Sequence, residues 1–230
     1  MEFLKFEKKL NIKYKDRDLL QQAFVHRSYI NENKNFKSSH NERLEFLGDA
    51  VLELIVTEAL YKKYPQSAEG ELTSYRSALV NAVTLSKIAA DLGMNEFLLL
   101  SKGESKDVGR ARTIILANTF ESFVGALYLD RGYDEAKKFI TENLLAKVEE
   151  EIVTKNLWQD AKSLLQEKAQ EVMNVTPSYK MHSEVGPDHN KIFTIGLYFG
   201  KDIITEGRGH SKQEAEQEAA KKALGVYKWS

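Results

Sequence analysis

The sequence His40-Asn-Glu-Arg-Leu-Glu-Phe-Leu-Gly-Asp-Ala50 combines an apolar helical repeat with closely spaced carboxylates. Leu44 and Leu47 recur at helical spacing, and the same pattern continues to Tyr64. Pro65 follows, and a proline cannot continue a helix. The sequence therefore predicts one long, mostly buried helix from Glu42 to Tyr64.

Three acidic residues share one face of this predicted helix. Glu42, Glu45 and Asp49 stand at i, i+3 and i+7, which places them within about 60° of one another. Like charges this close repel, and a bound cation relieves that repulsion. A solvated acidic face is the alternative. Gly48 weighs against it, because a glycine inside a helix costs roughly 0.5–1 kcal/mol and indicates close backbone approach.

A second apolar stretch, Ile114–Leu129, also carries polar residues on one face. Asn118 and Glu121 stand at i and i+3. If the two helices pack together, these side chains join Glu45 and Asp49 in a site made only of oxygen ligands. Such a site suits Mg²⁺ or Mn²⁺ rather than zinc.

The rest of the chain predicts two domains. The predicted helices are Asp16–Ser28, Glu42–Tyr64, Glu71–Leu92, Thr113–Asp130, Asp134–Val153 and Asp160–Met173, with loops at 29–41 and 101–111. The period then changes to two, which predicts strands near 179–184, 192–199 and 201–206. Ser211 caps a final helix to Tyr227, with Glu214 completing a capping box. We expect an all-α domain at 1–153, a linker at 154–158 and a small α-β-β-β-α domain of the α+β class at 159–228.

Composition excludes several classes of protein. The chain has 230 residues, 42% of them hydrophobic and 29% charged, with a net charge of −1 and no cysteine. Disulfide scaffolds, zinc ribbons and thiol catalysis are therefore excluded. The longest run of apolar residues and glycine, Phe123–Leu129, is too short to span a membrane, and the N-terminus resembles no export signal. A cytoplasmic protein is expected. No glycine-rich phosphate loop is present, so no nucleotide cofactor is expected.

These motifs resemble those of the ribonuclease III family. Asn41–Asp49 is similar to the nine-residue signature of the family, and Leu116–Asp130 resembles its second acidic motif. The C-terminal unit resembles the double-stranded-RNA-binding domain of its bacterial members. The resemblance implies a homodimer that cleaves double-stranded RNA with Mg²⁺, or Mn²⁺ as a substitute, leaving 5′-phosphate and 3′-hydroxyl ends. Processing of ribosomal RNA precursors and other structured transcripts is also implied.

The resemblance also implies roles for particular residues. The metal ligands would be Glu45, Asp49, Asn118 and Glu121, with Asp49 and Glu121 catalytic and Glu42 and Glu69 as outer acids. Phe46 would contact the partner subunit in the dimer, and an ordinary core position is the alternative.

At the position of Asn118 the family usually has Asp. This departure favours one alternative function, a duplex-RNA-binding protein with a weakened nuclease site. A metal-dependent phosphohydrolase acting on small molecules is a second alternative, but it leaves the C-terminal unit without a role.

Contacts with RNA are predicted in the C-terminal unit. Gly207-Arg-Gly-His-Ser-Lys212 leads into a helix N-terminus, where free N–H groups and basic side chains bind phosphate. The predicted RNA-binding residues are Arg208, His210, Ser211 and Lys212, together with Gln166, Glu167 and His189 by resemblance to the family. Domains of this kind recognise the shape of duplex RNA.

Overall fold

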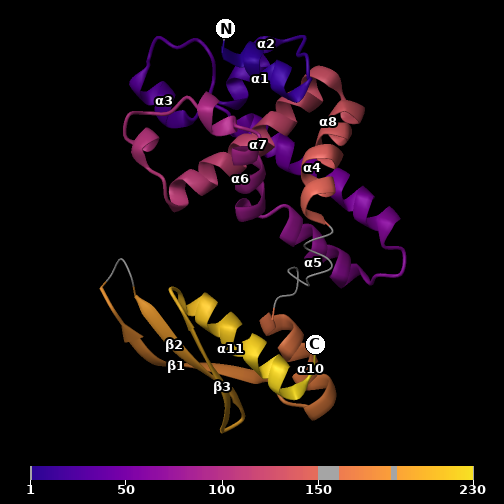
Figure 1. Cartoon of the computed structure of the whole chain (residues 1–230), viewed down its shortest axis with the longest axis vertical. Coiled ribbons are helices and arrows are strands. Elements are labelled where there is room, and N and C mark those ends of the chain that lie inside the picture. Colours follow the sequence, from indigo (N-terminus) through magenta and orange to yellow (C-terminus); the bar gives the residue numbers. More distant parts are fainter. Residues whose placement is uncertain (1, 150–160, 188–190, 230) are drawn as a thin grey trace. The chain divides into compact units, whose positions relative to one another are not determined.

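The computed structural model describes residues 2–149, 161–187 and 191–229. The chain divides into two compact units, Met1–Trp158 and Gln159–Ser230 (Figure 1). The predicted linker at 154–158, the predicted helix beyond residue 149 and His189 all lie outside the described residues. Within the described residues, no helix is long and apolar enough to cross a membrane.

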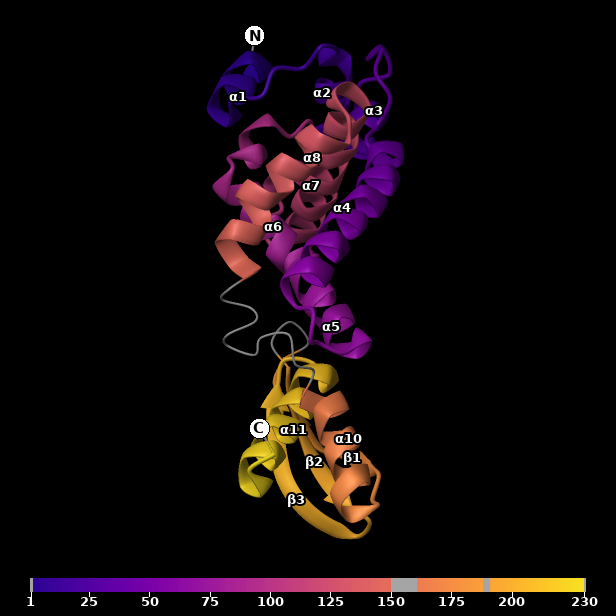
Figure 2. The same ribbon diagram turned by 90° about the vertical axis from the view of Figure 1, so that its right-hand side faces the viewer.

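Helices are the main elements in the described part of the first unit, as predicted. Its elements are α1 (Glu2–Leu10), α2 (Arg17–Ala23), α3 (Arg27–Glu32), α4 (Glu42–Lys63), α5 (Glu69–Leu79), α6 (Ala82–Asp91), η1 (Met94–Phe97), η2 (Glu104–Lys106), α7 (Arg110–Arg131), α8 (Tyr133–Ile140) and the π-helical η3 (Thr141–Glu149). The long helices α4 and α7 lie side by side (Figures 1 and 2). Most of α7 is buried, from Ile115 to Leu127, so it forms the centre of the core.

The prediction of a single helix over Glu71–Leu92 was wrong. The chain forms α5 and α6 instead, separated at Val80 and Asn81. The Asn81 side chain accepts a hydrogen bond from the Thr84 amide at 2.9 Å and begins α6. Asparagine stabilises a helix start better than a helix interior, so it breaks the apolar repeat here.

The segment predicted as one helix over Asp16–Ser28 is also divided. Asp16 begins α2 by accepting a hydrogen bond from the Asp18 amide at 2.9 Å, but α2 ends at Ala23. Val25 then forms a parallel bridge with Leu99, and α3 follows from Arg27. The predicted loop at 29–41 is therefore helical up to Glu32. The extended backbone at Val25 depends on Leu99, which is 74 positions away in the sequence, and local periodicity does not reveal such a partner.

The second unit has the predicted order α-β-β-β-α. Its elements are α10 (Ala161–Met173), β1 (Pro177–Val185), β2 (Ile192–Phe199), β3 (Asp202–Gly209) and α11 (Lys212–Tyr227). The strands form an antiparallel sheet in the order β1-β2-β3. The two helices cover one face of the sheet, where Leu165, Leu197 and Ala219 are fully buried (Figure 2).

Candidate functional site

The helices α4 and α7 cross with their backbones in direct contact. A Cβ atom added to Gly48 would lie 1.8 Å from the carbonyl oxygen of Glu121, and one added to Gly125 would lie 2.2 Å from that of Leu44. Both distances are too short for any side chain, so only glycine permits this crossing. The close approach predicted at Gly48 is confirmed.

The crossing brings four predicted ligand residues into one cluster. Glu45 and Asp49 project from α4, while Asn118 and Glu121 project from α7. The Asn118 side chain hydrogen-bonds the Glu45 carboxylate, and the charges of Asp49 and Glu45 both act on Glu121. Glu45, Asn118 and Glu121 are half-buried, and Asp49 is exposed. The cluster is therefore open to a ligand from solvent on the side of Asp49.

The cluster disfavours negative charge. Burial, reinforced by the charges of Asp49 and Glu45, raises the pKa of Glu121 to about 8. Burial also raises the pKa of Glu45, as do the nearby charges of Glu42 and Asp49, while the hydrogen bond from Asn118 opposes this shift. Carboxylates that raise one another's pKa in this way attract a cation, which would offset their charge.

The side chains do not surround a single point. Among the described residues, no three His, Cys, Asp or Glu side chains are arranged to hold a metal ion. Electrostatic coupling acts over several ångströms, whereas Mg²⁺ is coordinated at about 2.1 Å. The donor chemistry therefore fits a hard cation, and the carboxylates would have to turn towards one point to bind it.

The two predicted outer acids lie in different surroundings. Glu42 is close enough to raise the pKa of Glu45, and its carboxylate pairs with Arg27 at 3.2 Å. Glu69 is the first residue of α5. It lines a pocket with Thr57, and Thr57 lies about two turns of α4 beyond Asp49. The structure thus brings Glu42, and not Glu69, beside the four-residue cluster.

Phe46 is not a core residue. Its side chain is 82% exposed, although it lies between the buried Leu44 and Gly48 on α4. The alternative that assigned it to the core of this chain is wrong. An aromatic ring so exposed on a structured helix is typical of a surface that contacts another protein.

Two buried polar residues that sequence reasoning missed support the cluster. Asn41 is 4% exposed, and its side-chain amide donates to the carbonyl oxygen of Ala23 at 3.2 Å. The Ser122 hydroxyl donates to the carbonyl oxygen of Asn118 at 2.7 Å and lies 3.4 Å from that of Asn41. These bonds fix the start of α4 against the end of α2 and against α7. The sequence signal for Ser122 was a polar residue inside the apolar stretch Ile114–Leu129, whereas Asn41 stands among other polar residues and gave no such signal.

The predicted RNA-binding residues of the second unit are mostly exposed. Gln166 and Glu167 lie on the open face of α10, and Arg208, His210 and Lys212 surround the start of α11. Ser211 caps α11, since its hydroxyl accepts from the Glu214 amide at 3.1 Å.

Acidic side chains of α11 already accept hydrogen bonds from the preceding backbone. The Glu214 carboxylate accepts from the His210 amide at 2.8 Å, and the Glu218 carboxylate accepts from the Arg208 amide. The Glu214 carboxylate thus accepts from the amide of His210, the residue before the capping Ser211, and not from Ser211 itself. Among the side chains at this helix end, those of Arg208 and Lys212 carry the positive charge that attracts phosphate.

Comparisons with known proteins agree with the two units described above, one helical and one α-β-β-β-α. Residues 16–148 match the family model described as ribonuclease-III-like, and residues 161–227 match the double-stranded RNA binding motif. The chain is 46% identical over 220 residues to Ribonuclease 3 of Borreliella burgdorferi, covering 96% of this chain and 89% of that protein. It is 45% identical to Ribonuclease 3 of Streptococcus pneumoniae, covering 93% and 91%.

Among solved structures, the chain is similar to the nuclease domain of ribonuclease III from Campylobacter jejuni. The TM-score is 0.57 at 39% sequence identity, and the match covers 63% of this chain and 96% of that domain. That domain has structural flexibility in a region involved in dimer formation.

Proposed function

This chain belongs to the ribonuclease III family and is an endoribonuclease of double-stranded RNA, and we propose that the α4–α7 crossing is where it hydrolyses the phosphodiester. The observation that carries this proposal is the cluster of Glu45, Asp49 and Glu121 beside Asn118. It is the place where both acidic motifs meet.

The proposed cofactor is Mg²⁺, with Mn²⁺ as a substitute. Glu45, Asp49 and Glu121 would hold it through carboxylate oxygens, and Asn118 would offer a neutral carbonyl oxygen. Bound divalent cations would polarise the phosphoryl group and offset the negative charge that develops on it. Asn118 also orients the Glu45 carboxylate by its hydrogen bond. The chain's own contribution is thus to gather negative charge at one half-buried position.

We further propose a homodimer that contacts its partner through Phe46. The exposure of this ring supports the proposal, and the chain is 39% identical to a bacterial nuclease domain with a region involved in dimer formation. The second unit would bind the duplex through α10 and the start of α11. The proposed substrates are ribosomal RNA precursors and other structured transcripts, and the proposed location is the cytoplasm.

A weakened nuclease that mainly binds duplex RNA is the second candidate. One observation favours it: Asn118 is neutral and donates to Glu45, so it brings no charge to a site that would hold divalent cations.

Cleavage of a long, perfect RNA duplex by the full chain separates the two candidates. We expect cleavage in millimolar Mg²⁺ or Mn²⁺, products with 5′-phosphate ends, and no cleavage in EDTA. Duplex binding should persist in EDTA. Tight binding with no cleavage in either metal would favour the second candidate, and cleavage unaffected by EDTA would contradict the metal proposal.

A further inference from the structure

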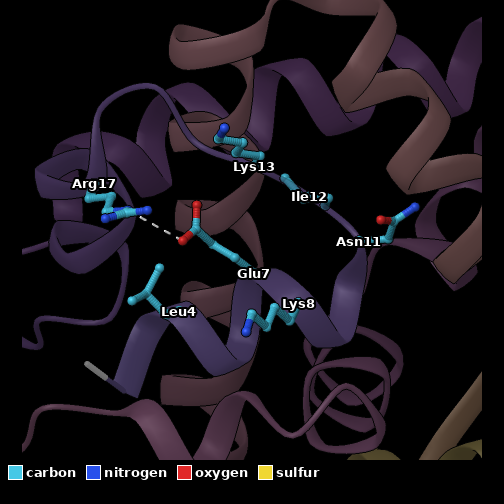
Figure 3. Close-up of a pocket in the computed structure, with 7 residues that line it drawn as sticks. All are labelled: Leu4, Glu7, Lys8, Asn11, Ile12, Lys13 and Arg17. Atoms are coloured by element: carbon cyan, nitrogen blue, oxygen red, sulfur yellow. Dashed lines mark ion pairs between the residues drawn. The ribbon is translucent and has the colours of Figure 1, made fainter.

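A basic pocket lies at the start of the first unit, on elements that contribute nothing to the acidic cluster. It is enclosed by α1, the segment after it and the first residue of α2, and its volume is about 280 Å³. Figure 3 shows Glu7 in the middle of the lining residues, with Arg17 on its left, Lys13 above it and Lys8 below it.

The pocket contains an arginine oriented by a buried carboxylate. Glu7 is only 6% exposed, and its Oε1 atom accepts a hydrogen bond from the Tyr14 amide at 2.8 Å. Its Oε2 atom lies 3.4 Å from Nε of Arg17, whose side chain is 58% exposed. Because the carboxylate pairs with Nε, it fixes the guanidinium plane and leaves the terminal nitrogens as donors.

Two further cations line the pocket without an acidic partner. Among the described residues, neither Lys8 nor Lys13 has a carboxylate within ion-pair distance. The lining therefore carries three cations against the single carboxylate of Glu7. The surrounding segment 5–17 holds six Lys and Arg but only two acids, in a chain whose net charge is −1. Positive charge is concentrated here.

We propose that this pocket binds a phosphate group. The terminal nitrogens of Arg17 would meet two phosphate oxygens in the paired geometry that suits a guanidinium, and Lys8 and Lys13 would supply the remaining charge. Leu4 and Ile12 add apolar surface to the lining. The phosphate belongs either to an RNA strand or to a small free phosphate compound. The first source rests on the proposed function, and the second does not.

The test compares two double variants of the full chain with equal change in charge. Lys8→Gln/Lys13→Gln removes the two unpaired cations of the pocket. Lys5→Gln/Lys15→Gln removes two exposed cations of the same segment that do not line it. Arg17 is kept, because its loss would leave the buried Glu7 carboxylate without its ion pair. Thermal unfolding of both variants should match the parent.

The first arm uses pyrophosphate in a metal-free buffer at constant ionic strength, followed by amide chemical shifts. We expect saturable shifts within residues 4–17 of the parent and of the Lys5/Lys15 variant. The Lys8/Lys13 variant should bind about tenfold more weakly or worse, since two charge-assisted contacts are lost. Absence of saturable shifts in this segment of the parent would overturn the proposal, and so would equal weakening in both variants. If a variant fails to fold, the pyrophosphate titration of the parent alone decides the proposal.

The second arm measures duplex RNA affinity against salt concentration in EDTA. If RNA supplies the phosphate, the Lys8/Lys13 variant should lower the slope of log K against log salt by about one to two, and the Lys5/Lys15 variant by less. If duplex affinity is unchanged while pyrophosphate binding is lost, the ligand is a free phosphate compound. Failure of RNA cleavage would leave the pyrophosphate arm unaffected, so the two proposals fail separately.

Discussion

Gly48 of α4 and Gly125 of α7 face each other across the helix crossing, and the Cβ position of each lies within 3.0 Å of the other's amide nitrogen. The contact is reciprocal, so neither helix can move closer or slide without a clash. Glu45 and Asp49 flank Gly48, while Glu121 precedes Gly125 by about one turn. The glycine pair therefore sets the separation of the acidic side chains.

Substitution of Gly48 by alanine should damage both stability and cleavage. The new methyl group would overlap the Glu121 carbonyl oxygen, so α7 must shift together with its carboxylate. Overpacking of this kind costs about 1–3 kcal/mol in the free energy of unfolding, measured by urea denaturation. Cleavage of duplex RNA should fall by more than about tenfold, because catalytic groups tolerate little displacement.

Gly70→Ala is the matched control. Gly70 also lies in a helix, α5, but a Cβ atom there would meet nothing within 4 Å. The same substitution should therefore raise the free energy of unfolding by up to about 1 kcal/mol through helix propensity alone. If both variants lost stability equally, the crossing at Gly48 would not be the cause.

Asp49→Asn and Glu121→Gln should abolish cleavage and spare duplex binding. Each change replaces a carboxyl group that can ionise to bind a cation by a neutral amide and hardly alters volume, so the fold is kept while affinity for a divalent cation falls. Gel-shift titration in EDTA gives the binding, and product formation in Mg²⁺ gives the cleavage.

Thermal unfolding gives a second readout for the same two variants. Mg²⁺ should raise the melting temperature of the parent, since it offsets repulsion within the cluster, and should raise that of each variant less. An unchanged response to Mg²⁺ would mean that these residues do not hold the cation.

Local spacing predicted the acidic faces of α4 and α7 because a helical repeat fixes which side chains share a face. Gly48 also predicted the close crossing, since its cost in a helix needs a tertiary reason. The break at Asn81 and the bridge between Val25 and Leu99 were missed, because each depends on competition between local and distant contacts. The exposure of Phe46 was equally hidden, since apolar spacing alone does not say which apolar residue faces solvent.

Phe46→Glu should convert a dimer to a monomer. A carboxylate at the centre of an apolar contact would be desolvated without a partner, and this opposes association. Light scattering at micromolar concentration should give twice the chain mass for the parent and the chain mass for the variant. Thermal unfolding of the monomeric variant should remain cooperative, because the ring contributes little to its own core.

Val226→Glu provides the comparison for this variant. Val226 is 65% exposed on α11, so the substitution adds the same charge to an exposed apolar position of the other unit. It should leave the mass unchanged. A parent that is already monomeric would contradict the proposed dimer.

Glu58 should contribute stability that is lost in acid. Hydrogen bonds from Lys62, Tyr133 and Lys137 lower the pKa of its carboxyl group from 4.5 to about 2. Because the folded state holds this proton less tightly than the unfolded state, the contribution is present above about pH 4.5 and disappears as the pH falls towards 2. Glu58→Gln should reduce the loss of stability over that range, as followed by circular dichroism. Glu53→Gln, on the exposed face of the same helix, should not.

Asn118→Asp should make the protein less stable without metal and more responsive to Mg²⁺. Asn118 now donates a hydrogen bond to Glu45, and an aspartate would remove that donor and add a fourth carboxyl group to the cluster. The melting temperature in EDTA should therefore fall. The Mg²⁺ concentration for half-maximal cleavage should also fall, because a carboxylate binds Mg²⁺ more strongly than a neutral amide. Mn²⁺, which binds a given site more tightly than Mg²⁺, should partly restore the rate of the asparagine form.

Asn118→Ala distinguishes the lost hydrogen bond from the added charge. It removes the donor to Glu45 without bringing a carboxylate, so it should lower the melting temperature in EDTA but should not lower the Mg²⁺ requirement. Duplex binding in EDTA should be the same for all three proteins, since the contacts proposed for duplex binding lie on the other unit and at the pocket of α1, and neither includes Asn118. If the aspartate form has the same metal dependence and rate as the parent, Asn118 is not a ligand. Glu42, whose charge already acts on Glu45, would then be the next carboxylate to substitute. Glu69 is more distant, because it lines a pocket with Thr57, which lies about two turns of α4 beyond Asp49.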